Sequence, residues 1–209
     1  MTGRTVRISI DQPSREVLSG ASRLLAEGGV VLYPSDTVYG LLCDAADPDA
    51  VRRVAKLKGY ARRRPFIVLA GDLGAAVRIA RLGEAAIPVA RRLWPGPLTL
   101  VAPAAAAAPA HLPSDAGEIA VRCPADPISQ MLLELFGAPL VSTSANLAGQ
   151  PHPASVGDVP KRIREGCGLV LDGGPVAGGR KPSTVARIGP DGPEVLREGA
   201  LPAGELQEG

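Results

Sequence analysis

The chain has few aromatic residues, few cysteines and no long apolar run, and each shortage excludes a class of protein. Phe, Trp and Tyr make up 3% of the 209 residues, which argues against an RNA-binding surface built from stacked aromatic rings. The three cysteines (Cys43, Cys123 and Cys167) are widely spaced and contain no C-x-x-C pair, which argues against a disulfide framework or a zinc site. No apolar run approaches the roughly 18 residues of a membrane span, and the N-terminus lacks a signal-peptide core. We therefore expect a cytoplasmic protein with no membrane segment.

Charge is almost balanced over the whole chain, so it says little about partners. The 23 basic and 21 acidic residues leave a formal net charge of +2. Paired basic residues recur along the sequence and are typical of solvated helix faces and loops. The run Arg62–Arg64 is different, because we expect it in a short loop that faces the candidate site described below.

Strand-like and helix-like patterns alternate along the chain. Helical spacing of apolar residues, with caps such as Ser14 and Asp47-Pro48, predicts helices, and short apolar runs predict strands. The predicted helices cover 14–27, 47–59, 72–82, 84–93, 127–136 and 156–165, and the predicted strands cover 30–33, 66–69, 98–101, 119–122, 140–142, 169–171, 184–188 and 194–197. This alternation, with a hairpin-like pair at the end, predicts an α/β fold with a mixed sheet flanked by helices. We expect one domain over 1–209, with a core of about 12–198 and a polar tail at 199–209.

The most informative stretch runs from Val141 to Asn146. It holds three hydroxyls and a carboxamide directly after an apolar strand candidate. Small donors at the end of a buried strand lie where α/β folds bind ligands. Ser142, Ser144 and Asn146 are therefore candidates for a cradle that holds a phosphate or an amino acid, although a capped turn would explain them as well.

Other strand ends and two cations point to the same place. Thr37 follows the strand candidate 30–33 and can offer a hydroxyl, while Asp36 beside it could orient a cation or cap the turn. Lys58 lies at the end of a predicted helix. The helix dipole favours a cation there in any case, and the alternative is that Lys58 supplies a point charge for a phosphate. Arg122 ends an apolar strand candidate, and its charge requires an anionic partner that is either a ligand or an internal acid. Together these residues predict an anion-binding cleft.

Metal ligands are not apparent in the sequence. The two histidines, His111 and His152, lie in predicted loops without metal-ligand spacing, and no Ser-His-Asp triad is legible. We expect no protein-derived metal site.

The ordered motifs closely resemble the YrdC/Sua5 (TsaC-type) family of L-threonylcarbamoyladenylate synthases over roughly residues 12–206. The motifs that carry the resemblance are Pro34–Leu41, Lys58, Trp94–Thr99, Val121–Pro124, Ser144-Ala145-Asn146 with Gly149 and Pro151, Leu171–Pro175, Ser183-Thr184-Val185 and Leu196–Gly199. The resemblance implies a YrdC-like fold, in which a twisted, open, mixed sheet surrounds a deep cationic cleft. It also leads us to expect that the C-terminal domain of Sua5-type members is absent.

The implied activity condenses L-threonine, bicarbonate and ATP into threonylcarbamoyl-AMP and pyrophosphate, for the t6A modification at position 37 of tRNA. By the same resemblance, Thr37, Arg122, Ser142 and Ser183 would contact threonine. The residues expected to contact ATP are Lys58, Arg64, Ser144, His152 and Arg197, with Asn146 shaping their loop. Lys58 and Arg122 would be the catalytic cations. Mg²⁺ would travel on the nucleotide, and the implied partners are tRNA and the proteins that transfer the threonylcarbamoyl group.

Some positions depart from the family pattern and keep alternatives open. Family members usually have Lys-x-Arg where this chain has Lys58-Gly59-Tyr60. Many of them have a histidine where this chain has Leu69, and often a serine where it has His152. One alternative is a non-catalytic module that binds double-stranded RNA or tRNA through the cationic cleft. The other is a YciO-like paralogue that acts on another carbamate.

Overall fold

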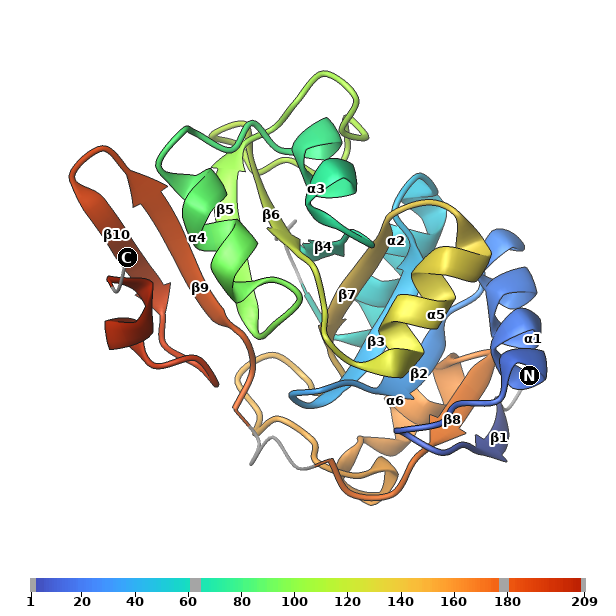
Figure 1. Ribbon diagram of the computed structural model, residues 1–209. Coiled ribbons are helices and arrows are strands. Elements are labelled where there is room, and N and C mark those ends of the chain that lie inside the picture. Colours follow the sequence, from blue (N-terminus) through green and yellow to red (C-terminus); the bar gives the residue numbers. More distant parts are fainter. Residues whose placement is uncertain (1–2, 61–64, 177–180, 208–209) are drawn as a thin grey trace.

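A single mixed sheet forms the centre of the computed structural model, which describes residues 3–60, 65–176 and 181–207. The sheet has ten strands in the order β1-β8-β2-β3-β7-β4-β6-β5-β9-β10, with both parallel and antiparallel pairs (Figure 1). The strands are β1 (Arg4–Arg7), β2 (Val31–Pro34), β3 (Tyr39–Asp44), β4 (Ile67–Leu69), β5 (Leu98–Pro103), β6 (Glu118–Arg122), β7 (Leu140–Ser144), β8 (Leu169–Asp172), β9 (Thr184–Gly189) and β10 (Gly192–Arg197). The predicted α/β class with a mixed open sheet is confirmed.

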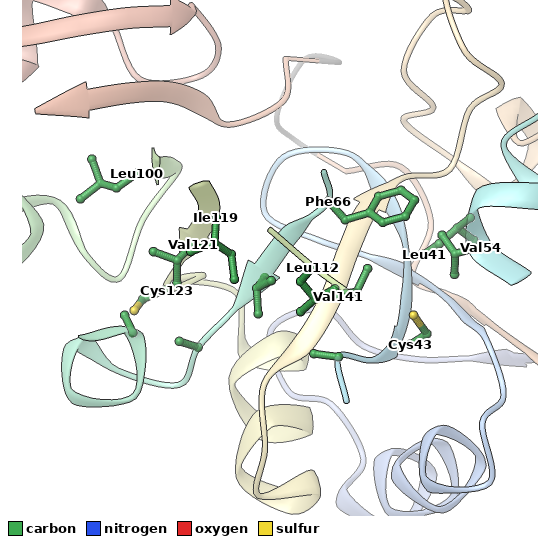
Figure 2. Packing of buried hydrophobic residues seen from close by; sticks show 14 of the residues in the cluster. Leu41, Cys43, Val54, Phe66, Leu100, Leu112, Ile119, Val121, Cys123 and Val141 are labelled. Carbon is green, nitrogen blue, oxygen red and sulfur yellow. The ribbon is translucent and has the colours of Figure 1, made fainter. Parts of the chain in front are cut away.

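Helices cover both faces of the sheet. They are α1 (Arg15–Ala26), α2 (Pro48–Leu57), α3 (Leu73–Ile79), α4 (Ala86–Leu93), α5 (Pro127–Phe136) and α6 (Lys161–Gly166), with short 3-10 helices η1 (Val156–Asp158) and η2 (Ala203–Leu206). Helices α1 and α5 lie side by side on one face (Figure 1), where Leu18 and Leu132 are fully buried. Helix α2 packs on the other face, where Val54 lies next to Leu41 of β3 (Figure 2). No helix among the described residues is both long and apolar enough to span a membrane.

The helix starts follow from their caps. Ser14 accepts a hydrogen bond from the backbone N–H of Val17, and Asp47 caps α2 with Pro48 at the first position. Asp126 caps α5 in the same way, since its Oδ1 accepts the Ser129 N–H at 2.7 Å. Such caps satisfy backbone donors that have no partner inside the helix.

The structure differs from the expected elements in several places. Strand β3 was not predicted, because its residues are buried on both sides and include Gly40, so they show no alternating pattern. Strand β1 was not predicted either, since its exposed residues carry no apolar signal and it pairs only at the sheet edge with β8. The helix predicted at 156–165 is interrupted at Pro160, which cannot donate a backbone hydrogen bond, and divides into η1 and α6.

The predicted polar tail is partly packed against the protein. Leu201 and Leu206 are buried, and η2 lies beside the β9–β10 hairpin (Figure 1). These two leucines pack the segment against the core, although its polar, glycine-bearing composition predicted a tail.

Candidate functional site

One cleft collects every predicted site residue that the structure describes. These residues come from the turns and strand ends around the middle of the sheet, and they are Thr37, Lys58, Arg122, Ser142, Ser144, Asn146, His152, Ser183 and Arg197. Arg64 lies outside the described residues. The described part of the lining contains three cations and no Asp or Glu. The described residues also contain no group of three or more His, Cys, Asp or Glu side chains able to hold a metal ion.

Lys58 is buried at the C-terminal end of α2, with a relative exposure of 2%. Its Nζ donates to the Asn146 backbone oxygen at 2.9 Å, to Asn146 Oδ1 at 3.3 Å and to the Ser144 backbone oxygen. Burial lowers the pKa of Lys58 to about 8. No acid among the described residues forms an ion pair with it, so neutral oxygens hold the ammonium group and leave its charge uncompensated.

The loop after β7 is ordered by its own side chains. Ser144 Oγ donates to Asn146 Oδ1, and Asn146 Nδ2 donates to the Gln150 backbone oxygen at 2.6 Å. Asn146 therefore shapes the loop and anchors Lys58. His152 lies close by, where burial, then Arg197 and Lys58, lower the pKa of its imidazole and keep it neutral near pH 7.

Arg122 forms an internal ion pair, so one of the two partners that the sequence left open, an internal acid, is present. Its Nη2 lies 2.7 and 2.6 Å from the two carboxylate oxygens of Asp36, and its Nε donates to the Gly96 backbone oxygen at 2.8 Å. Asp36 thus orients a cation, as its position suggested. Arg122 also lines the cleft. Asp36 holds its guanidinium in a fixed orientation there and balances its charge.

Hydroxyl groups cluster around this ion pair. Thr37 Oγ1 lies 3.1 Å from Ser35 Oγ in the turn between β2 and β3. Ser142 Oγ lies 3.2 Å from the phenolic oxygen of Tyr33. These groups give the Arg122 side of the cleft short donors and acceptors next to a neutral ion pair.

Ser183 and Arg197 reach the cleft from the β9–β10 region. Ser183 Oγ lies 2.8 Å from Thr99 Oγ1, and Arg197 Nη2 donates to the Ser183 backbone oxygen at 2.8 Å. Glycine is required at 199, because an added Cβ would lie 2.1 Å from the Pro182 backbone oxygen. Burial, followed by the charge of Arg122, lowers the pKa of Arg197, and no acid among the described residues pairs with it.

The sequence analysis did not predict an aromatic part of the lining, and it singled out Tyr60 only as a departure from the family pattern. Tyr33, Tyr60 and Phe66 all line the cleft. The Tyr60 and Phe66 rings stack at 5.9 Å, and Lys58 Nζ lies 5.6 Å from the centre of the Tyr60 ring. Each of the three lies at the end of an element or beside a loop, and only spatial proximity distinguishes them from core aromatics.

Residues 23–199 match the model of one protein family, Sua5_yciO_yrdC, which is described as "Telomere recombination". The chain is 35% identical to a threonylcarbamoyl-AMP synthase of Pyrococcus abyssi over 90% of this chain and 55% of that protein. It is 37% identical to a threonylcarbamoyl-AMP synthase of Xanthomonas campestris over 89% of this chain and the full length of that protein. The chain thus spans about half the length of the archaeal relative and all of the bacterial one.

Solved structures have the same architecture. The crystal structure of Escherichia coli YciO superposes with a TM-score of 0.89 at 28% identity, covering 98% of this chain and 99% of that chain. The Pyrococcus abyssi Sua5 structure complexed with L-threonine gives a TM-score of 0.90 at 32% identity, covering 98% of this chain and 60% of that chain. These matches extend over the whole of the sheet and the cleft.

Proposed function

The chain belongs to the Sua5_yciO_yrdC family, and we propose that it is an L-threonylcarbamoyladenylate synthase. The reaction condenses L-threonine and bicarbonate with ATP, giving threonylcarbamoyl-AMP and pyrophosphate. The product supplies the t6A modification at position 37 of tRNA, so tRNA and the threonylcarbamoyl-transfer proteins are its downstream partners. The relatives named threonylcarbamoyl-AMP synthase support this activity.

One observation carries the proposal. Residues from strands and turns far apart in the sequence meet in one cleft, where Lys58 and Arg197 have no acidic partner among the described residues and Arg122 has one. A polyanion such as a triphosphate favours uncompensated cations, whereas a zwitterion such as an amino acid favours a site with balanced charge. The cleft offers both environments side by side.

Threonine binds on the Arg122 side in this proposal. Arg122 receives its carboxylate, with Thr37, Ser142 and Ser183 as hydroxyl partners. All four residues line the cleft, and Asp36 fixes the orientation of Arg122. The Pyrococcus abyssi structure complexed with L-threonine supports a threonine site in this fold.

ATP binds on the Lys58 side. Lys58, Ser144, His152 and Arg197 contact the nucleotide, and Asn146 holds the loop and Lys58 together. Arg64 belongs to the same assignment from the sequence. Because the described lining contains no carboxylate, Mg²⁺ is carried on the phosphates rather than held by the protein.

The chemistry requires two anions to meet. A threonine carbamate must attack the α-phosphorus of ATP, and two unit charges at ~4 Å repel by about 4 kcal/mol near a protein surface. Lys58, Arg122 and Arg197 offset this repulsion and stabilise the charge that develops at phosphorus, with Mg²⁺ on the phosphates. Beyond that, the enzyme mainly aligns the reactants.

The proposed reaction takes place in the cytoplasm. The three cysteines are buried free thiols, which is typical of a reducing compartment.

The direct test is threonine-dependent release of pyrophosphate. The purified protein with ATP, bicarbonate and L-threonine should release pyrophosphate, and omission of threonine or bicarbonate should abolish the signal. If a relative from the family is active in parallel and this chain shows no threonine-dependent release, the proposal is wrong.

The same assay separates the two alternatives. A YciO-like enzyme, to which Tyr60 and Leu69 point, would prefer another amino acid in a panel. An RNA-binding module would show no nucleotide turnover and a binding constant that falls steeply with salt.

A further inference from the structure

Strand β4 forms an apolar wall in the Arg122 side of the cleft. It lies between β7 and β6 in the sheet (Figure 1). Ile67 is paired with Ser142 of β7, and Leu69 is paired with Arg122 of β6. Residues that are directly paired, and residues two apart on one strand, project from the same face of a sheet. Ile67 and Leu69 therefore lie between Arg122 and Ser142, and both line the cleft.

The side chains of this wall offer no hydrogen bond to a ligand. Ile67 and Leu69 are aliphatic, and many members of the family have a histidine where this chain has Leu69. Ile67 is half-buried and lines the cleft, so a ligand can contact it. Two strand spacings, roughly 10 Å, separate β6 from β7. A ligand that reaches from Arg122 to Ser142 must therefore cross these two side chains.

The hydroxyl groups assigned to threonine already have partners in the protein. Ser142 Oγ lies 3.2 Å from the Tyr33 phenolic oxygen. Thr37 and Ser183 each have another side-chain hydroxyl as a partner, at 3.1 and 2.8 Å. Among the described residues, the buried side-chain atoms that lack a partner include none of these three hydroxyls. They can accept a further hydrogen bond from a ligand, but none of them depends on one.

This arrangement determines which amino acids the site can reject. A site rejects an analogue that lacks a hydroxyl group strongly, by a factor of about 10⁴, when the loss leaves buried polar groups of the protein unpaired. Here the loss leaves each protein hydroxyl with its present partner. The methyl group of threonine has an apolar wall to contact, and loss of such a group weakens binding by about tenfold or more. The methyl group is therefore the better recognised half of the side chain.

We propose that Ile67 and Leu69 determine the side-chain specificity of this site and select β-branched amino acids of threonine size, so that L-valine is a second substrate. The inference rests on the proposed function. With valine, the amine bonds to the carbon of bicarbonate as water leaves, and one ammonium proton passes to solvent. A carbamate oxygen then bonds to the α-phosphorus of ATP as the bond to pyrophosphate breaks, which gives valylcarbamoyl-AMP. Only the side chain differs from the proposed reaction of threonine.

The first test is the order in which the wild type binds L-threonine, L-valine and L-serine, measured by calorimetry. Valine lacks the hydroxyl group of threonine, and serine lacks its methyl group. We expect valine to bind within about tenfold of threonine, and serine to bind more weakly than valine. The reverse order, with serine above valine, would show that the site requires the hydroxyl group and would overturn the inference.

Ile67→Ala removes part of the wall. Threonine and valine should then bind severalfold more weakly, because their methyl group loses its contact, whereas serine should bind as before. Unchanged serine binding also shows that the variant is folded. Ile188→Ala provides the control, since Ile188 is a half-buried strand residue that does not line the cleft, and it should change none of the three affinities. Equal losses for all three amino acids would overturn the role of the wall.

Pyrophosphate release distinguishes a failure of this inference from a failure of the proposed function. With ATP and bicarbonate, the wild type should release pyrophosphate in the presence of valine, with a kcat/KM within about tenfold of that for threonine. Release with threonine and none with valine would overturn the inference and leave the proposed function intact. If neither amino acid gave release, the proposed function would fail, and the order of the three affinities would still decide which half of the side chain the site recognises.

Discussion

The two sides of the cleft hold their cations in different ways. On the Lys58 side (Lys58, Ser144, Asn146 and His152), three neutral oxygens hold the ammonium group. On the Arg122 side (Arg122, Asp36, Tyr33 and Ser142), a carboxylate lies directly against the guanidinium. Neutral acceptors position a charge without cancelling it, whereas an acid positions it and also balances it. The contrast shows that a list of cations does not predict the electrostatic potential in a cleft. The groups that pair with each cation determine how much of its charge is left to attract a ligand.

The largest effect should follow from removing the uncompensated charge. We expect Lys58→Ala to lower kcat/KM for ATP by about a hundredfold, because the phosphates lose a buried cation that no acid among the described residues balances. The assay is threonine-dependent pyrophosphate release. Lys56→Ala is the control, since Lys56 lies two residues away on the same helix and is exposed. If Lys58→Ala kept the full rate, Lys58 would be structural only.

Removing the balancing acid should mainly affect stability. We expect Asp36→Asn to lower the free energy of unfolding by about 3 kcal/mol, because it leaves the buried Arg122 without its carboxylate. Urea denaturation measures the change. The control is Glu134→Gln, which breaks the ion pair with Arg15 that is exposed on both sides and should cost under about 1 kcal/mol. Equal effects of the two substitutions would contradict the balanced-pair description.

The segment that carries Ser183 and Arg197 connects the two sides, and Gly199 controls its position. We expect Gly199→Ala to destabilise the protein by about 2 kcal/mol, because the added methyl group collides with the backbone at Pro182. Thermal unfolding gives the difference. Gly204→Ala is the matched control, since an added Cβ there meets nothing within 4 Å. A Gly199→Ala protein as stable as the control would show that this backbone contact is not tight.

A smaller effect should appear in the pH dependence of ATP binding. Burial lowers the pKa of Lys58 to about 8. The Lys58 side chain is therefore mostly charged below pH 8 and loses its charge as the pH rises above that value. ATP affinity measured without threonine should therefore weaken severalfold between pH 7 and pH 9. The affinity of Lys58→Ala should be flat over this range. A wild-type profile that stays flat would show that the Lys58 charge does not contribute to ATP binding.

The sequence predicted the members of the cleft better than their partners. Thr37, Lys58, Arg122 and Ser142 could be placed together because each ends a recognisable strand or helix. The ion pair between Arg122 and Asp36 could not be assigned, since the two residues lie on different elements and a ligand would have satisfied the arginine equally well. The same holds for the fold: capped helices were recognised, whereas β3 and β1 lacked the periodicity that would reveal a strand.

Asp126 shows the remaining limit. Asp126-Pro127 is a clear helix start in the sequence, and nothing in that pattern indicates that the carboxylate is buried with one oxygen unpaired among the described residues. The burial of its second oxygen results from how α5 packs on β2 and β7, which is a property of tertiary structure. Local rules predict that a side chain caps a helix, and only the packing shows what else it faces.

The most direct test of the two-sided cleft is the binding of each ligand separately to Lys58→Ala and Arg122→Ala, measured by calorimetry with inorganic triphosphate and with L-threonine. We predict that Lys58→Ala loses triphosphate binding and keeps threonine binding, and that Arg122→Ala does the reverse. The ligand that still binds shows that each variant is folded. If both variants lost the same ligand, or if each lost the ligand assigned to the other side, the division of the cleft would be contradicted.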